Sequence, residues 1–167
     1  SQVTAAGNIG ISGGMGASSY YYHGVHIWNS TIASTGGGVT ITGQSEGDAG
    51  VYIGGSVNIS SATGATVTGT NTSVGSYNPG IYIDCGCSGG LTGTGDLTLN
   101  GTTAGDADGV QFSSSLVNRT GKLTVNGVTS SSYYLGVNVY NSSISSGGGD
   151  IVFNGDGGVS VTSSTLL

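Results

Sequence analysis

Two carboxylates, one lysine and two histidines are the residues whose types could support catalysis. Asp96 and Asp150 precede equivalent segments of two sequence repeats, and Lys122 holds the same place in the repeat between them. Glycoside hydrolysis needs two carboxylates that face one groove, whereas repeats two apart would separate Asp96 from Asp150 by about 9.6 Å. His23 and His26 have no acid beside them in the sequence. We therefore expect no catalytic role, with a polysaccharide lyase or hydrolase as the alternative.

A second pair of acids offers the ligand atoms that Ca²⁺ prefers. Asp106 and Asp108 stand just before Gly109, and carboxylate oxygens are typical Ca²⁺ ligands. The neighbouring repeats have Asn78 and Leu135 at this place, so the acids do not stack on adjacent repeats. We expect no cofactor, and Asp106 with Asp108 is the candidate pair if Ca²⁺ binds.

Cys85 and Cys87 flank Gly86, and the alternation of the preceding strand points both sulfurs inward. They are either two small buried apolar side chains or a disulfide, which an extracellular compartment would favour although the short spacing strains its geometry. A metal site needs more thiol or imidazole ligands than this pair supplies.

The composition excludes several classes of protein. Gly accounts for 35 of the 167 residues, and the formal net charge is −6 with only two Lys and Arg residues. Nucleic-acid binders need cations that displace counterions from phosphate, so no nucleic-acid partner is expected. No apolar run approaches the roughly 20 residues of a membrane-spanning helix. No signal peptide opens the chain, which suggests a processed or excised chain.

A repeat runs through the whole chain. In the first motif a glycine precedes apolar residues at alternate positions. A second motif alternates with it along the chain, as in GGVTITG (37–43) and GDLTLNG (95–101). Such alternation is the period of a strand with one buried face, and the bracketing glycines suit sharp turns. The first motif starts at Gly24, Gly50, Gly80, Gly109, Gly136 and Gly158, spaced by 22 to 30 residues.

With a weaker third strand between the two motifs, each repeat predicts one coil of an all-β, single-stranded parallel β-solenoid, or β-helix. Residues 1–167 would form one solenoid domain of about six coils, uncapped at both ends, with an axial length of about 29 Å at the spacing of adjacent strands. Stacked coils would place equivalent apolar residues in four inward rows. These rows are Val25, Val51, Ile81, Val110, Val137 and Val159; Ile27, Ile53, Ile83, Phe112, Val139 and Val161; Ile9, Val39, Ala65, Leu97, Leu123 and Ile151; and Ile11, Ile41, Val67, Leu99, Val125 and Phe153.

The same register predicts two polar rows on the outside. Asp96, Lys122 and Asp150 would form an ionic ladder with the only lysine between two acids, and exposed pairs of this kind contribute roughly 0–1 kcal/mol. A second row would stack side-chain amides that hydrogen-bond along the axis. Its members are Asn100, Asn126 and Asn154.

Neither end of the sequence has the atypical repeat that usually caps a solenoid. The last ten and first thirteen residues, read in that order, make one coil of 23 residues. We therefore expect either a module of a longer solenoid or copies that stack head to tail through open strand edges, with fraying ends as the plain alternative. The expected assembly interface is Gly158, Val159, Val161, Leu166, Leu167, Val3, Ile9 and Ile11.

Exposed aromatic residues gather on one side of the predicted rod, and such clusters suit a protein interface or stacking on sugar rings; covering of neighbouring coils is the alternative. The expected aromatic surface is His26, Tyr52, Tyr82, Trp28 and Tyr140. Glycosylation sequons are also frequent. Asn71, in the longest loop, is the best-placed acceptor, and the others are Asn29, Asn58, Asn118 and Asn141.

The segments GVHIWNSTIASTGGGVTITG (24–43) and GVNVYNSSISSGGGDIVFNG (136–155) resemble the strand repeats of bacterial surface and secreted proteins of the filamentous-haemagglutinin type. This resemblance implies a right-handed solenoid stalk outside the cell, used for adhesion or as a fibre. We expect an extracellular or cell-surface structural protein that assembles with itself, with glycans or a host surface as further partners and no membrane span. The alternatives are a carbohydrate-binding or polysaccharide-degrading β-helix and a donor-strand-exchanged β-sandwich pilin.

Overall fold

The computed structural model describes residues 1–14, 22–86 and 89–167, and these residues form strands, turns and bends without any helix. Within them there is accordingly no apolar helix of a length that would cross a bilayer. Every strand pairing is parallel. The parallel β-solenoid fold is thereby confirmed, and the antiparallel β-sandwich alternative is wrong.

The strands belong to two sheets. The eleven-stranded sheet contains β1 (Gln2–Ala5), β3 (Val25–Ser34), β5 (Val51–Ser61), β7 (Ile81–Asp84), β8 (Leu91–Gly93), β10 (Val110–Ser113), β11 (Leu116–Arg119), β13 (Val137–Tyr140), β14 (Ser143–Ser145), β16 (Val159–Thr162) and β17 (Thr165–Leu166). The six-stranded sheet contains β2 (Ile9–Gly14), β4 (Val39–Ser45), β6 (Ala65–Asn71), β9 (Leu97–Thr103), β12 (Leu123–Thr129) and β15 (Ile151–Asp156).

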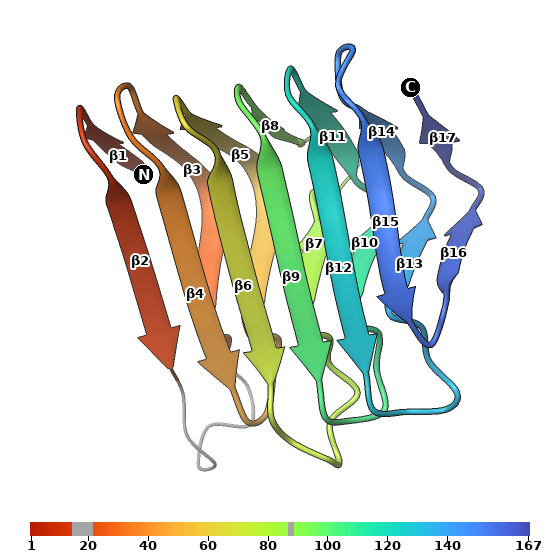
Figure 1. The fold of residues 1–167 in the computed structure, drawn as a ribbon. Helices are drawn as coiled ribbons and strands as arrows, with labels where there is room; N and C mark the ends of the chain where they lie inside the picture. The colour runs from red at the N-terminus through yellow and green to blue at the C-terminus, as the bar shows by residue number, and fades with distance from the viewer. Residues whose placement is uncertain (15–21, 87–88) are drawn as a thin grey trace.

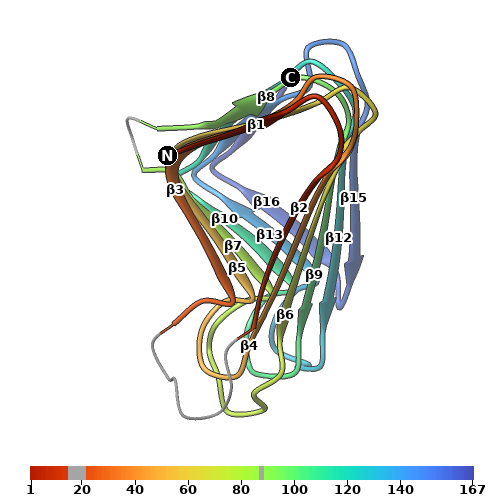
Figure 2. The same cartoon turned by 90° about the vertical axis from the view of Figure 1, so that its left-hand side faces the viewer.

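The cross-section of the solenoid is close to a triangle, as the view along the axis shows (Figure 2). The larger sheet bends into two faces because β3 and β5 each turn a corner within one strand. The first face holds the starts of β3 and β5 with β7, β10, β13 and β16. The second face holds β1, the ends of β3 and β5, and β8, β11, β14 and β17, and the six-stranded sheet is the third face.

The coil is right-handed. In Figure 1 the strands of the third face run downwards at the front, the chain returns upwards at the back, and successive coils advance towards the C-terminus on the right. Five coils have strands on all three faces, while β1 with β2 and β16 with β17 form incomplete coils at the two ends. The sequence count of about six coils therefore becomes five complete coils between two partial ones.

The four inward rows occur in the register that the alternation predicts. Val25 pairs with Val51, Val51 with Ile81, and the row continues to Val159 without a slip, and the other three rows do the same. Side chains in the middle coils, such as Ile53 and Leu99, are fully buried. Period-two alternation fixed this register because a shift by one residue would turn every apolar side chain outward.

Two columns of glycine explain how narrow the rod is where the third face meets the first. Gly43, Gly69, Gly101 and Gly127 face the glycines that open the next first-face strands, and a Cβ on Gly101 would lie well under 3.0 Å from the carbonyl oxygen of Gly109. None of these glycines has a positive φ. They are required for close approach of two backbones, so the expectation that they serve sharp turning is wrong here.

The corner between the first and second faces depends on a left-handed backbone conformation. One residue per coil adopts the left-handed region, and three successive corners carry serine hydroxyls that accept the N–H of an adjacent coil: Cys85 N–H to Ser115, Ser115 N–H to Ser142, and Ser142 N–H to Ser164. This serine ladder fixes the bend. The left-handed residues are Asn29, Gly55, Gly86, Ser114, Asn141 and Ser163.

Arg119 is the one fully buried charged side chain among the described residues. Its guanidinium donates hydrogen bonds to the carbonyl oxygens of Ile59, Thr92, Thr94 and Gly95, which belong to two preceding coils. Burial lowers the pKa of Arg119 to about 10, so the group is still charged at neutral pH. Arg119 therefore ties coils together along the axis from inside the rod.

Candidate functional site

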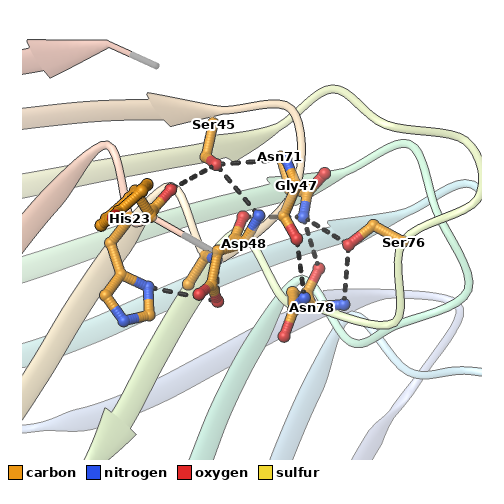
Figure 3. Close-up of polar contacts among 9 residues, drawn as sticks. His23, Ser45, Gly47, Asp48, Asn71, Ser76 and Asn78 are labelled. Carbon is orange, nitrogen blue, oxygen red and sulfur yellow. Dashed lines mark hydrogen bonds and ion pairs between the residues drawn. The ribbon is translucent and has the colours of Figure 1, made fainter. Parts of the chain in front are cut away.

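An inward polar row organises the loops between the third and first faces. Ser45, Asn71, Thr103 and Thr129 pair in register at the ends of their strands and point into the corner. Figure 3 shows how Ser45 accepts the N–H groups of Gly47 and Asp48, while the Asn71 amide donates to backbone and side-chain oxygens of the neighbouring loops. The backbone groups of these loops are thereby satisfied inside the corner.

His23 and Asp48 lie within ion-pair distance of each other at the outer edge of this corner. The distance between His23 Nδ1 and Asp48 Oδ1 is 3.2 Å, and both side chains are largely covered. Burial lowers the pKa of His23 below its usual 6.5 and the nearby His26 lowers it further, while the Asp48 carboxylate opposes the shift. Burial prevails, so His23 is neutral at pH 7, and its buried Nδ1 makes no hydrogen bond within the described residues.

The lowered pKa of His23 makes stability depend on pH. Because the unfolded chain binds the proton more tightly than the folded chain, the free energy of unfolding falls as the pH drops below 6.5. We expect His23→Gln to reduce this loss between pH 6.5 and pH 5, as measured by thermal unfolding at a series of pH values. Equal pH profiles for the two proteins would contradict the assignment.

Five rings form a continuous aromatic cluster beside the His23–Asp48 contact. His23 stacks on Tyr52 with 4.6 Å between ring centroids, and Trp28 lies nearly parallel to Tyr52 at 6.3 Å. His26 and Tyr82 meet Tyr52 edge to face at 5.0 and 5.6 Å. Tyr52 is thus the centre, and the cluster covers the first face over three coils.

Tyr140 does not belong to the aromatic cluster. Tyr140 in β13 occupies the same position in its strand as Trp28 in β3, but strands β5, β7 and β10 lie between these two strands. Its side chain is half exposed and isolated from the other rings within the described residues. Four of the five residues of the expected aromatic surface therefore lie in the cluster, namely His26, Trp28, Tyr52 and Tyr82, and His23 joins them.

A pocket of about 330 Å³ lies beside the cluster. Trp28 and Tyr52 form one wall, and Asp84, Asn29 and backbone of the first corner form the rest. A flat ring beside hydrogen-bonding groups is the arrangement that suits a sugar ring.

The two outward ladders have different outcomes. The amides of Asn100, Asn126 and Asn154 are linked by two hydrogen bonds of 2.8 Å along the axis. In the expected ionic ladder, the Asp96 carboxylate accepts the backbone N–H of Lys122 at 2.9 Å and does not pair with the Lys122 ammonium group. Within the described parts of the chain, His23–Asp48 is the only acid–base contact at ion-pair distance.

The expected ionic ladder of Asp96, Lys122 and Asp150 is therefore wrong as a set of ion pairs, although its register is right. The physical reason is local. These residues precede the strands at an exposed corner, where a backbone donor lies closer to the carboxylate than a long, solvated lysine side chain.

Asp106 and Asp108 point to different partners. Asp108 is buried and accepts the Leu135 N–H and the Asn138 amide, and Asp106 accepts the Ser131 hydroxyl. The described residues contain no group of three or more acid, His or Cys side chains that could hold a metal ion. The two carboxylates are occupied in holding the loops of adjacent coils.

The cysteine pair is described only in part. Cys85 is buried, and burial raises the pKa of its thiol. Cys87 lies outside the described residues, so a disulfide between them stays a prediction.

Asn71 is a wrong choice of glycosylation acceptor. Its side chain is fully buried, and the amide donates to Asp48, Ser76 and Asn78. The loop after Asn71 is long, but the residue itself is the last inward position of β6. Asn29, Asn118 and Asn141 are exposed, although the amides of Asn29 and Asn141 join hydrogen bonds of the corner, and Asn58 is half-buried and donates to Thr92.

The two end coils expose the residues of the predicted assembly interface unequally. Val159, Val161 and Leu166 are 41–43% exposed, although their equivalents in the middle coils are fully buried, and Leu167 is more exposed still. At the other end Val3 is 44% exposed, while Ile9 is 7% exposed. The structure thus presents apolar edges at both ends of the described coils.

Sequence reasoning missed the serine ladder, the His23–Asp48 pair and the role of Arg119. The ladder has a readable signal, since Asn-Ser, Gly-Ser or Ser-Ser recurs after first-face strands at 29–30, 55–56, 114–115, 141–142 and 163–164. His23 and Asp48 meet only because loops from successive coils stack, and no local pattern indicates that contact.

The chain matches no family model, no curated protein and no solved structure. The parallel β-solenoid therefore rests on the structure, and the resemblance to filamentous-haemagglutinin-type repeats rests on the sequence motifs alone.

Proposed function

We propose that this chain is a non-catalytic structural rod that works outside the cell as a stalk or fibre subunit and extends by stacking of its coils on those of a second copy. The half-exposed apolar edge at β16 and β17 is the observation that carries this proposal. Unpaired strand edges recruit further strands, and parallel addition would bury Val161 as its equivalents in the middle coils are buried.

The register sets a condition on such a joint. Leu166 pairs with Ile144 and lies in the same row of aligned residues as Ser30, so Leu167 falls in the row of Thr31. At the other end Gln2 pairs with Thr31, so Ser1 falls in the row of Ser30. If β17 of one copy and β1 of the next shared one coil, the last two residues of one would overlap the first two of the other. One of these two-residue tails must therefore move aside for a shared coil.

A charge placed in the end coil tests the proposal. We expect Val161→Glu to weaken self-association about tenfold or more, because a carboxylate would be buried without a partner in the joint. Sedimentation velocity at rising concentration measures this. Val128→Glu is the matched control, because Val128 is 42% exposed on the side of the rod.

The controls decide between the possible outcomes. Wild type and Val128→Glu should associate alike while Val161→Glu stays monomeric with an unchanged circular dichroism spectrum. A wild-type chain that remains monomeric at every concentration, or two variants that behave identically, would refute the head-to-tail assembly.

The aromatic cluster supports a second candidate, a glycan-binding or adhesive surface. Trp28 is 51% exposed and nearly parallel to Tyr52, at the mouth of the pocket that Asp84 also lines. We expect Trp28→Ala to abolish binding in an oligosaccharide array, with Tyr140→Ala as a control that removes an equally exposed ring. Retention of binding by Trp28→Ala would rule out this surface.

A further inference from the structure

The outward side of the third face carries three straight rows of small polar side chains. Adjacent strands align Thr40, Thr66, Thr98 and Thr124 in the first row. The second row continues from threonine into the asparagine ladder, and the third holds two more threonines. These rows contain Ser12, Thr42, Thr68, Asn100, Asn126 and Asn154, and Gln44, Thr70 and Thr102. Towards the C-terminal end the first row continues to Val152, and the third continues to Val128 and Asp156.

The array is uncharged. Strands β2, β4, β6, β9 and β12 contain no Asp, Glu, Lys or Arg, and Asp156 at the end of β15 is the one charge within the sheet. Asp96, Lys122 and Asp150 stand at the corner before the strands. A protein or ionic surface would find little electrostatic complementarity on this face.

The hydroxyl groups of this array are unused. Among the described residues, the eight threonines of the three rows make no side-chain hydrogen bond to protein, whereas Thr92, Thr103 and Thr129 elsewhere all do. Thr40 and Thr42 are exposed, and Thr66, Thr68, Thr98 and Thr124 are half-buried. Their hydroxyls and methyls are therefore available to whatever lies on the face.

The array is also stiff and regular. The five pairings of this sheet show no register shift, in contrast to the β3–β5 pairing of the other sheet. Threonine is restricted at χ1, and the asparagine amides hold one another at 2.8 Å along the axis. Such a face meets an ordered surface with little loss of side-chain entropy.

The repeat of the array is close to that of ordered water. Within a row, the hydroxyls are spaced by about 4.8 Å along the axis of the rod, and neighbouring rows lie about 6.7 Å apart along each strand. Tetrahedral water with an O···O distance of about 2.75 Å has second neighbours at about 4.5 Å and a longer lattice repeat of about 7.3 Å. Across the four coils of the first row, the axial mismatch accumulates to only about 0.9 Å.

We propose that the third face binds ice, with the rows of threonine and asparagine holding a layer of water that joins the ice lattice. The three outward rows contain no aromatic ring, which argues against a crystalline polysaccharide as the occupant, because sugar rings stack on aromatic faces. Water-mediated hydrogen bonds are nearly as favourable as direct ones, so the face needs no charged anchor.

The test compares ice binding by the whole chain with that of two tyrosine variants. Wild type should shape ice crystals, depress the freezing point below the melting point and partition into slowly grown ice. Thr98→Tyr, at the centre of the array, should lower partition into ice about tenfold because the ring holds the face off the lattice. Gln111→Tyr places the same ring on the outward side of the first face and should match wild type.

Each outcome bears on the proposal. Circular dichroism of both variants shows that the fold is retained. Wild-type protein that neither shapes ice nor partitions into it would overturn the proposal, as would equal losses in Thr98→Tyr and Gln111→Tyr. Retention on crystalline cellulose or chitin without any affinity for ice would assign the face to a polysaccharide and also overturn it.

Discussion

Gly101→Ala should destabilise the solenoid by about 3 kcal/mol or more, although it adds a single methyl group. The new Cβ would lie against the carbonyl oxygen of Gly109 on the opposing strand, at a distance well under 3.0 Å. The Gly109 carbonyl belongs to the backbone and cannot rotate away as a flexible side chain could, so the two sheets would have to separate where the rod is narrowest (Figure 2). Urea unfolding followed by circular dichroism measures the loss.

Gly75→Ala is the matched control for this substitution. A Cβ on Gly75 would have no heavy atom within 4 Å, and the residue lies in an exposed turn without a positive φ. We expect the free energy of unfolding of this variant to stay within about 0.5 kcal/mol of wild type. Similar stabilities for the two variants would show that the glycine columns do not limit the approach of the sheets.

Arg119→Ala should cost about 3–5 kcal/mol of unfolding free energy. The substitution removes a fully buried side chain and leaves the carbonyl oxygens of Ile59, Thr92, Thr94 and Gly95 without their donors. Arg119→Lys should also lose most of the stability, because one ammonium cannot serve four carbonyls spread over two coils. Thermal and urea unfolding measure both losses.

The control for Arg119 is the exposed neighbour Thr120, whose substitution by alanine should have little effect. A stable Arg119→Ala protein, with less than about 1 kcal/mol lost, would show that water replaces the guanidinium and that the coils are not tied together from inside. An Arg119→Lys protein as stable as wild type would show that the positive charge, and not the four hydrogen bonds of the guanidinium, stabilises the coils.

The inward rows were predictable because their signal is local and repeated. Each coil places the same alternation on its first and third faces, so six weak patterns reinforce one another in a single register. The asparagine ladder followed from that register. The inward positions and strand pairing of residues such as Val110 and Leu123 could therefore be predicted from the sequence alone.

What could not be predicted depends on how wide the rod is and where the loops lie. The glycine columns look like turn residues until the distance between the two sheets is known. Asn71 looks exposed in the sequence because a long loop follows it, and Arg119 looks like a surface residue because arginine usually is one. Strand position alone groups Tyr140 with Trp28, although three strands separate them along the axis.

The central claim is that the coils continue in register from one copy to the next. Cryo-electron microscopy of the protein at rising concentration tests it most directly through the axial repeat of any filament. A joint in which β16–β17 of one copy and β1–β2 of the next share a coil predicts a repeat of six coil spacings, about 29 Å. Filaments with a repeat of about 34 Å, which is seven spacings, or isolated short rods at every concentration would contradict the shared coil.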